Sequence, residues 1–395
     1  MIRFLASRRK LWAFGGLALG LGLTALDVYF SILTYIPQYR IRNDFRLMYG
    51  TADLTLHQGY GHLYDLAAQK AAIENLGAGF YWSPFLNPPP LVWLVTPLTV
   101  LPFDLSVVVW TVLVLAALGV AWYAAAPGDR FSKAAHGALW LGVLPVAFGV
   151  MVGQPVALVA AAVAGCWWLA DRDRPALAGL ALSLIALKPQ IALLVPLCLV
   201  VSGHGRVFGG WLVATFFMVM VSLALLGHDG VLRYRDALSL ASGWQITRGY
   251  AVSGVIGTGL QLYGVQAVVL VATMAAAWRW RGAGTAMPIA AGITGSLLFT
   301  PYVGFQDFAM LVVAGWLVLR SQPSTAQVAL LVAGFALLEL ALVVLAVPIL
   351  VAEVLLLASM VYHSPGRPVA DSAPLAPTGS MDRPANTFLA PNPPN

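Results

Sequence analysis

Asp44 and Lys188 are the two charged residues whose positions are hardest to explain as ordinary surface. Asp44 lies just beyond a very apolar segment, in "RIRNDFRLMYGTADL" (40–54), in a chain of which only 10% of residues are charged. Lys188 lies within "LALSLIALKPQIALLVPLCLV", and a lysine at membrane depth costs at least about 2.5 kcal/mol unless it faces a cavity or a partner. A positioned carboxylate can act as a general base. A buried cation can bind an anionic head group, most simply a lipid phosphate.

Each of these residues also has a purely structural interpretation. Asp44 could form a solvated ion pair with the neighbouring arginines, and Lys188 could extend its ammonium to the membrane interface. Asp307 could cap the helix that follows it. Gln154 and Gln190 could be amides that pack helices together. No single residue decides between these alternatives.

The composition places these residues in a membrane protein. Of the 395 residues, 60% are hydrophobic, and the mean hydropathy is +0.82, whereas soluble domains are about half apolar. The net charge of +6 is modest. In a membrane protein, such an excess of basic residues usually lies in the cytoplasmic loops, so we expect no nucleic-acid partner. The two cysteines, Cys166 and Cys198, lie in apolar segments, which indicates neither a disulfide nor a metal site.

We therefore expect an all-α, polytopic integral membrane protein, with about 10–13 transmembrane or re-entrant helices over residues 1–363. Residues 11–33 predict the first span, and the basic residues before it would hold the N-terminus in the cytoplasm. Several later apolar segments are short for a span, which is typical of half-helices that line a cavity. Residues 88–102 would enter and leave by the outer face. The Pro-rich tail, 364–395, is predicted to be disordered.

Two outer loops are predicted, at 34–88 and 227–259. In the first loop, residues 44–57 and 64–77 have the pattern of two short amphipathic helices lying on the membrane surface. The first of these places Phe45, Met48, Ala52 and Leu56 on one face. Asp65 is the expected N-cap of the second helix.

Under this topology the unusual polar motifs gather on the outer side. They are Asn43-Asp44 with Tyr49, "SPFLNPPP" (83–90), "GQP" (153–155), "LKPQ" (187–190) and "TPYVGFQD" (300–307). Taken in this order, the motifs resemble those of glycosyltransferase family 87, polytopic mannosyltransferase-like enzymes with a GT-C fold. The resemblance extends over about residues 20–320.

The resemblance implies transfer of a hexose, with mannose the first expectation. The donor would be a polyprenyl-phosphate sugar, and the acceptor a lipid or glycan hydroxyl on the extracytoplasmic face of the inner (plasma) membrane. It also implies that an aspartate early in the first outer loop is the catalytic base, and Asp44 has that position. We expect the nearby arginines to favour the charged form of Asp44.

The residues expected to bind the donor phosphate or the substrate are Tyr49, Asn87, Gln154, Lys188, Gln190, Arg248, Tyr302 and Asp307. A single base and a single displacement would give inversion at the anomeric carbon, because a retaining double displacement needs a second carboxylate as nucleophile. We expect no metal, no cofactor besides the donor substrate, and a monomer surrounded by membrane lipids.

Three departures from the family pattern are visible. Pro155 follows the Gly-Gln pair where relatives more often have Asn, and Gln306 stands where they often have Tyr. Tyr302 stands where they often have His, which leaves room for a different sugar or acceptor.

Two other classes of protein remain open at this point. Broken helices and an intramembrane lysine fit a lipid or small-molecule transporter or flippase equally well, although the two halves of the sequence show no convincing internal repeat. A non-catalytic scaffold would leave Asp44 and Lys188 unexplained. Geometry distinguishes the classes. In an enzyme, Asp44, Lys188 and Asp307 should border one cavity that opens to both the outer leaflet and water. In a transporter, the cavity should run through the protein between inverted halves.

Overall fold

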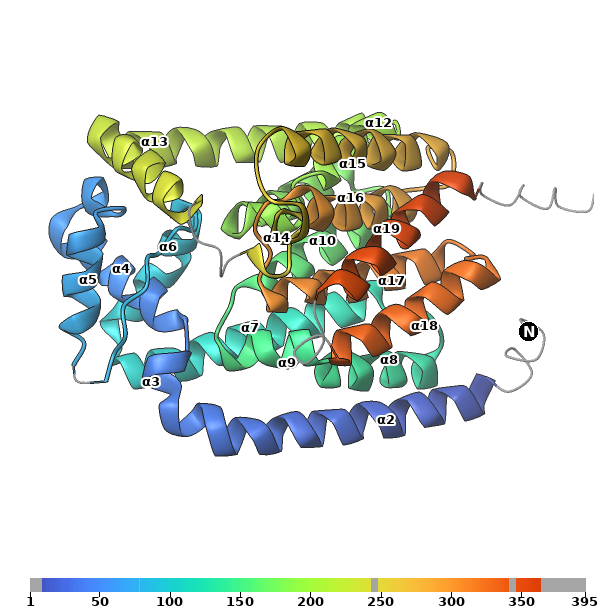
Figure 1. The fold of residues 1–395 in the computed structure, drawn as a ribbon, viewed down its shortest axis with the longest axis horizontal. Helices are drawn as coiled ribbons and strands as arrows, with labels where there is room; N and C mark the ends of the chain where they lie inside the picture. The colour runs from blue at the N-terminus through green and yellow to red at the C-terminus, as the bar shows by residue number, and fades with distance from the viewer. Residues whose placement is uncertain (1–8, 78, 243–247, 341–345, 364–395) are drawn as a thin grey trace, which may run out of the picture. The chain divides into compact units, whose positions relative to one another are not determined.

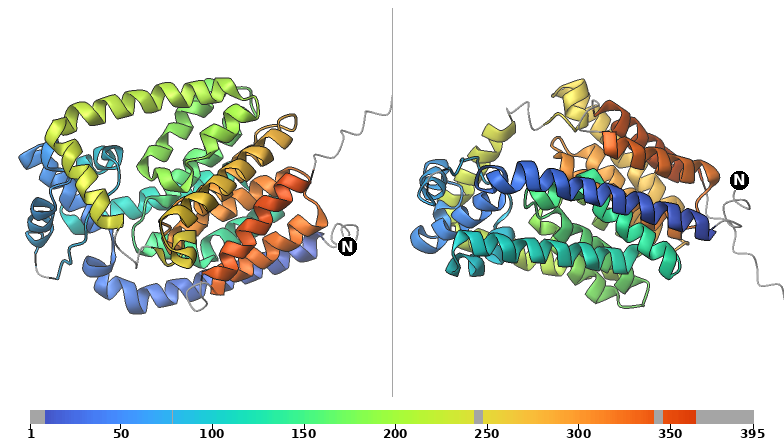
Figure 2. Two further views of the ribbon diagram at one scale, coloured as in Figure 1. Left: turned by 45° about the horizontal axis from the view of Figure 1, so that its top comes forward. Right: turned by 90° about the horizontal axis from the view of Figure 1, so that it is seen from below.

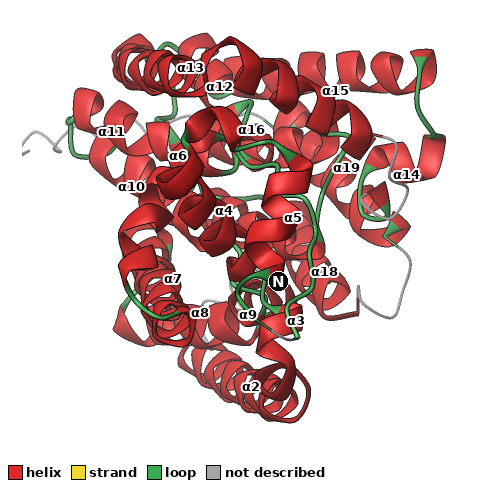
Figure 3. Ribbon diagram, turned by 90° about the vertical axis from the view of Figure 1, so that its left-hand side faces the viewer, coloured by secondary structure: helices red, strands yellow, loops and turns green. Residues whose placement is uncertain are grey.

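Helices make up all the regular secondary structure that is described (Figure 3). The computed structural model describes residues 9–77, 79–242, 248–340 and 346–363, and no strand occurs within these ranges. The prediction of an all-α protein is confirmed. The tail predicted to be disordered, 364–395, lies outside the described residues.

The α-helices run in the following order. They are α2 (Arg9–Phe30), α3 (Tyr39–Arg42), α4 (Phe45–Gln58), α5 (Leu66–Glu74), α6 (Pro89–Val95), α7 (Phe103–Ala125), α8 (Arg130–Gly142), α9 (Leu144–Met151), α10 (Val156–Ala170), α11 (Pro175–Leu182), α12 (Val195–Val201), α13 (Gly205–Ser242), α14 (Val252–Ile256), α15 (Leu260–Arg279), α16 (Ala286–Phe299), α17 (Ala309–Arg320), α18 (Thr325–Leu340) and α19 (Val347–Tyr362). Short 3-10 helices adjoin several of them, among them η4 (Thr96–Val100), η5 (Ser183–Leu187), η6 (Pro189–Ile191) and η8 (Phe305–Phe308).

Several of these helices are suited to a bilayer. Over the described residues, four helical segments are long and apolar enough to cross a membrane, and the pair α8–α9, bent by 56°, makes a fifth if it forms one span. Shorter apolar helices of 10–17 residues accompany them, as expected for half-helices packed among full spans. The protein is therefore a polytopic membrane protein.

The helices α3 to α6 form a lobe at the left-hand end of Figure 1. The helix α2 runs along the bottom of the view, from its N-terminal end on the right toward this lobe. We call residues 39–95 the N-terminal lobe.

Outside this lobe, arginines at the ends of two helices bond to backbone carbonyl oxygens. Arg320, at the end of α17, donates to the carbonyl oxygens of Ala125 and Ala126 at the end of α7. Arg279, at the end of α15, donates to the carbonyl oxygen of His363.

Within the lobe, α4 is packed on more than one face. Of the residues that the spacing places on one face, Phe45, Met48 and Ala52 are buried, whereas Leu56 is 55% exposed. Gly50 on another face meets Ile73 of α5. Because α5 and α6 both pack against α4, most of this helix is covered by protein, whereas its C-terminal end is exposed.

The second predicted helix of the lobe begins as the sequence indicates. The Asp65 side chain accepts hydrogen bonds from the backbone N–H groups of Ala67 and Ala68, both at 3.1 Å, and so caps α5. The segment 88–102 forms α6 and η4 and packs against α4. The Tyr49 hydroxyl donates to the carbonyl oxygen of Leu101 at 2.7 Å. This segment therefore begins and ends beside the lobe, as a re-entrant segment would.

The range 227–259 contains more helix than a loop would. The chain bends at Gly227, whose φ of 63° is a conformation that glycine adopts without strain, and α13 then continues to Ser242. The bend brings the second part of α13 onto the lobe, which Figure 2 shows in its left-hand view. There Tyr234 stacks on Tyr64 with ring centroids 4.0 Å apart, and Arg233 donates to the carbonyl oxygen of Gly61. The segment was expected to be a loop because it is too polar for a span, but an amphipathic helix on a protein surface has the same composition.

Candidate active site

A continuous run of hydrogen bonds joins Asp44, Gln154, Lys188 and Asp307, which we call the site cluster. Gln154 Nε2 donates to Asp44 Oδ2 at 2.7 Å. Lys188 Nζ donates to Gln154 Oε1 at 3.1 Å and to Asp307 Oδ1 at 2.5 Å. Asp307 Oδ2 accepts the backbone N–H of Gly304 at 2.9 Å. Four residues from distant parts of the sequence thus form one polar unit in an otherwise apolar protein.

The backbone around Asp44 leaves its carboxylate free for this cluster. Asp44 precedes the first residue of α4, where an aspartate commonly accepts N–H bonds from its own helix, but its side chain makes no such bond. Asn43 Oδ1 accepts the N–H of Phe45 at 2.9 Å in its place. The N–H of Asp44 donates to the carbonyl oxygen of Val152 at 2.7 Å, which ties the start of α4 to the end of α9.

Gly153 permits this close approach. Its φ of 69° favours glycine, and a Cβ atom at this position would lie 2.3 Å from Asn43 Oδ1. The indole N–H of Trp110 donates to the Gly153 carbonyl oxygen at 2.8 Å. Contacts with Asn43 and with Trp110 therefore fix the turn that carries Gln154 beside Asp44.

Lys188 lies where the backbone leaves its helix. It stands between η5 and η6 with φ −153° and ψ 74°, directly before Pro189. Lys188 is 2% exposed and Asp307 is 0% exposed. The interpretation of Lys188 as a side chain that extends to the interface is wrong, because its ammonium is buried against a carboxylate. Asp307 is also more than a helix cap, since one of its oxygens pairs with Lys188.

Asp44 is more exposed than Lys188 and Asp307. Its side chain is 35% exposed, while the Arg46 side chain beside it is 4% exposed. Burial raises the pKa of Asp44, whereas the hydrogen bond from Gln154 and the charges of Arg46 and Lys188 oppose this shift. Arg46 favours the charged form of Asp44, as predicted, but the effect of burial is larger. A carboxylate with a raised pKa is better suited to accept a proton near neutral pH.

The other arginines near Asp44 are engaged elsewhere. Arg40 pairs with Asp104 at 3.1 Å, and Arg42 Nε donates to Gln38 Oε1 at 2.7 Å. Only Arg46 approaches the Asp44 carboxylate, with Nη1 3.5 Å from Oδ1. The interpretation of Asp44 as a solvated surface ion pair does not fit this geometry.

Two further predicted residues lie close to the site cluster. Tyr302 is 38% exposed, and burial together with the negative charges of Asp307 and Asp44 raises the pKa of its hydroxyl. Asn87 Nδ2 donates to the carbonyl oxygen of Leu187, the residue before Lys188, at 3.3 Å. Both could contact a substrate bound at Asp44.

The remaining predicted residues are not joined to the site cluster. Tyr49 is buried, and its hydroxyl is bonded to the Leu101 carbonyl oxygen. Gln190 and Arg248 are both half-buried, and in the described structure neither side chain is hydrogen-bonded to the cluster. Trp110 was not predicted, because a tryptophan in an apolar helix gives no sign that it supports a distant turn.

The helical architecture and the buried ionic site define a polytopic membrane protein with a polar site at the edge of its apolar body. A comparison with protein families matches the model of glycosyltransferase family 87 over residues 85–301, more than half of the chain. The chain belongs to this family and is a membrane glycosyltransferase, which confirms the resemblance seen in the motifs. Family membership favours the enzyme over the transporter and the scaffold.

The matched region covers part of the candidate site. It contains Asn87, Gln154, Lys188, Gln190 and Arg248. Asp44 and Tyr49 precede it, and Tyr302 and Asp307 follow it, so the assignment of Asp44 and Asp307 to the site rests on geometry. No match was found among curated proteins or solved structures.

Proposed function

We propose that this glycosyltransferase moves a hexose, with mannose the first candidate, from a polyprenyl-phosphate donor to a hydroxyl of a lipid or glycan. The observation that carries the proposal is the site cluster, in which a partly exposed carboxylate, Asp44, is backed by a buried amide, ammonium and second carboxylate. Asp44 acts as the general base in this proposal. No metal and no further cofactor is needed.

The chemistry follows from the position of Asp44. The acceptor hydroxyl gives its proton to Asp44, its oxygen bonds to the anomeric carbon, and the bond from that carbon to the phosphate oxygen breaks, with its electrons leaving on the phosphate. A base must lie within about 2.6–3.2 Å of the hydroxyl for this transfer. The only other carboxylate in the cluster, Asp307, is fully buried and paired with Lys188. This arrangement supports a single displacement and therefore inversion.

The buried members of the cluster position the base and contribute charge. Gln154 fixes one oxygen of Asp44 and is itself held by Lys188. Lys188 has three N–H donors, of which one bonds Gln154 and another bonds Asp307. Its positive charge, together with that of Arg46, favours the negative charge that develops on the departing phosphate.

The donor test uses the purified protein in lipid vesicles. The acceptor is a lipid extract from a strain that lacks this protein, because the acceptor should accumulate there without the transferred sugar. We expect sugar transfer from polyprenyl-phosphate mannose and none from the nucleotide sugar GDP-mannose, because a lipid-linked donor can keep its tail in the bilayer while its sugar reaches Asp44. Polyprenyl-phosphate donors of other hexoses provide the comparison for sugar identity. Transfer from the nucleotide sugar would contradict the proposed donor class.

We also propose that the site faces the extracytoplasmic side of the plasma membrane. The basic residues before α2 and the cluster at 279–281 favour the cytoplasm, and Asp53 lies on α4, the helix that Asp44 precedes. Asp53→Cys should therefore react with an impermeant maleimide added to intact cells, and Arg281→Cys should not. The native Cys166 and Cys198 are both 0% exposed and should give little background. The reverse labelling pattern would place the site on the cytoplasmic side.

A further inference from the structure

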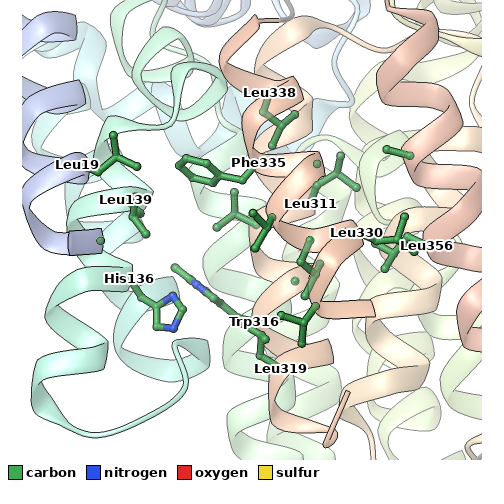
Figure 4. Close-up of a pocket in the computed structure, with 18 of the residues that line it drawn as sticks. Leu19, His136, Leu139, Leu311, Trp316, Leu319, Leu330, Phe335, Leu338 and Leu356 are labelled. Carbon is green, nitrogen blue, oxygen red and sulfur yellow. The ribbon is translucent and has the colours of Figure 1, made fainter. Parts of the chain in front are cut away.

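An apolar cavity of ≈ 550 Å³ lies between α2, α8, α17, α18 and α19. Figure 4 shows Leu19 of α2 and Leu139 of α8 on one side of it, and Phe335 and Leu338 of α18 on the other. Its size is within the range of small-molecule pockets, about 300–1,000 Å³. No residue of the site cluster lines it. It is lined by α17 from Leu311 to Leu319, and Asp307 precedes the start of that helix.

The cavity opens toward the outer surface of the helices. Three of its lining residues are largely exposed: Trp12 at 54%, Leu19 at 54% and Val332 at 68%. All three belong to apolar helices, and the exposed surface of such helices faces lipid in a membrane protein. A molecule can therefore enter this cavity from the bilayer.

Four of the lining residues are glycines, namely Gly15, Gly16, Gly315 and Gly334, and their lack of side chains leaves the interior of the cavity open. A Cβ atom added to Gly15 or to Gly334 would meet no atom within 4 Å. Larger side chains at either position would extend into this space. Gly334 lies in the middle of α18 with no unusual φ, so a larger residue there can occupy part of the cavity without straining the backbone.

Glu353 of α19 is the unusual residue in this apolar surrounding. It lines the cavity and is 2% exposed, and neither carboxyl oxygen has a hydrogen-bond partner within the described part of the chain. Burying a polar group without a partner is costly. Such a group in a native structure calls for an explanation, and a ligand that supplies the missing partner is one.

We propose that this cavity binds a neutral, single-chain membrane lipid whose hydroxyl group pairs with Glu353. A neutral carboxyl group has one O–H donor and a carbonyl acceptor, and a hydroxyl matches both. An anionic head group finds no lysine or arginine among the lining residues. An ammonium head group would have to lose its water in an apolar slot at a cost of several kcal/mol. The apolar walls fit the hydrocarbon chain. This site does not depend on the proposed sugar-transfer function.

The test is photolabelling of the full chain in lipid vesicles with hexadecan-1-ol that carries a diazirine in mid-chain. The matched control probe is the same diazirine hydrocarbon without the hydroxyl. Labelled peptides are located by mass spectrometry, and unlabelled hexadecan-1-ol competes. We expect competed labelling on α18 and α19 by the alcohol, and labelling at least about threefold weaker by the hydrocarbon.

Three variants decide the result. Gly334→Leu should weaken the competed labelling, because the larger side chain occupies part of the cavity. Glu353→Leu should weaken labelling by the alcohol about three- to tenfold and should raise the melting temperature, because it removes an unpartnered buried carboxyl. Glu353→Gln keeps a donor and an acceptor and should label like the wild type. Undiminished labelling of Gly334→Leu, or equal labelling by the two probes, would overturn the proposal.

Discussion

Replacement of Asp44 by Asn is expected to lower sugar transfer by about 10²–10⁴-fold, the usual contribution of a positioned general base. Asn keeps the size of the side chain and an oxygen that can accept the hydrogen bond from Gln154, so the variant should fold and insert normally. Asp44→Glu should recover little, because an extra methylene displaces the carboxylate from the hydroxyl. The measurement is sugar transfer in reconstituted vesicles, normalised to protein amount.

A matched control is available in the same part of the molecule. Asp104 carries a carboxylate whose side chain is 59% exposed and pairs with Arg40, but it lies outside the site cluster. Asp104→Asn should transfer sugar at a rate close to that of the wild type. Near-normal transfer by Asp44→Asn would remove Asp44 from the mechanism.

The second large effect is expected from the buried pair. Lys188→Met should lower the free energy of unfolding by about 3–5 kcal/mol, because it leaves Asp307 buried and unpaired. Met suits the apolar sequence around Lys188, but the 2.5 Å contact between Lys188 and Asp307 makes this substitution costly. The double variant Lys188→Met, Asp307→Leu should regain much of the stability and none of the sugar transfer. Thermal unfolding in one detergent and the transfer assay measure the two quantities.

Gln190→Met provides the control for this pair. Gln190 follows Lys188 by two positions and is half-buried, but its side chain is not hydrogen-bonded to the site cluster. It should change stability by less than about 1 kcal/mol. Wild-type stability of Lys188→Met would show that the buried ion pair contributes nothing, and transfer by the double variant would show that the pair is not needed for the reaction.

The sequence could predict which motifs gather, because polar residues beside apolar segments can only lie at membrane interfaces or inward-facing sites. Asp44, Gln154, Lys188 and Asp307 were all selected on this ground, and the structure joins them. The sequence could not predict which of these side chains bond to one another. The Lys188–Asp307 bond depends on how η5 and η8 pack, and no local pattern records that arrangement.

The failures have identifiable causes. Leu56 has helical spacing with Phe45, but α4 has more than one buried face, so the single-face pattern did not apply at its end. Tyr49 was selected as an aromatic residue in a motif, and its hydroxyl instead fixes the Leu101 backbone. The continuation of α13 beyond Gly227 was missed because glycine and polar residues are also typical of loops.

The pH dependence of kcat/KM tests the role of Asp44 most directly, because it reports the protonation of an essential base in the free enzyme. A base works when deprotonated, so activity should fall as the pH decreases through the pKa of Asp44. Because burial raises that pKa, the fall should occur above the ordinary range of an aspartate. Gln154→Leu removes a hydrogen bond that lowers the pKa, so the fall in the remaining activity should move to higher pH. Two results would contradict the assignment of Asp44 as the base. One is a kcat/KM that does not fall at low pH, and the other is a fall that occurs at the same pH in Gln154→Leu as in the wild type.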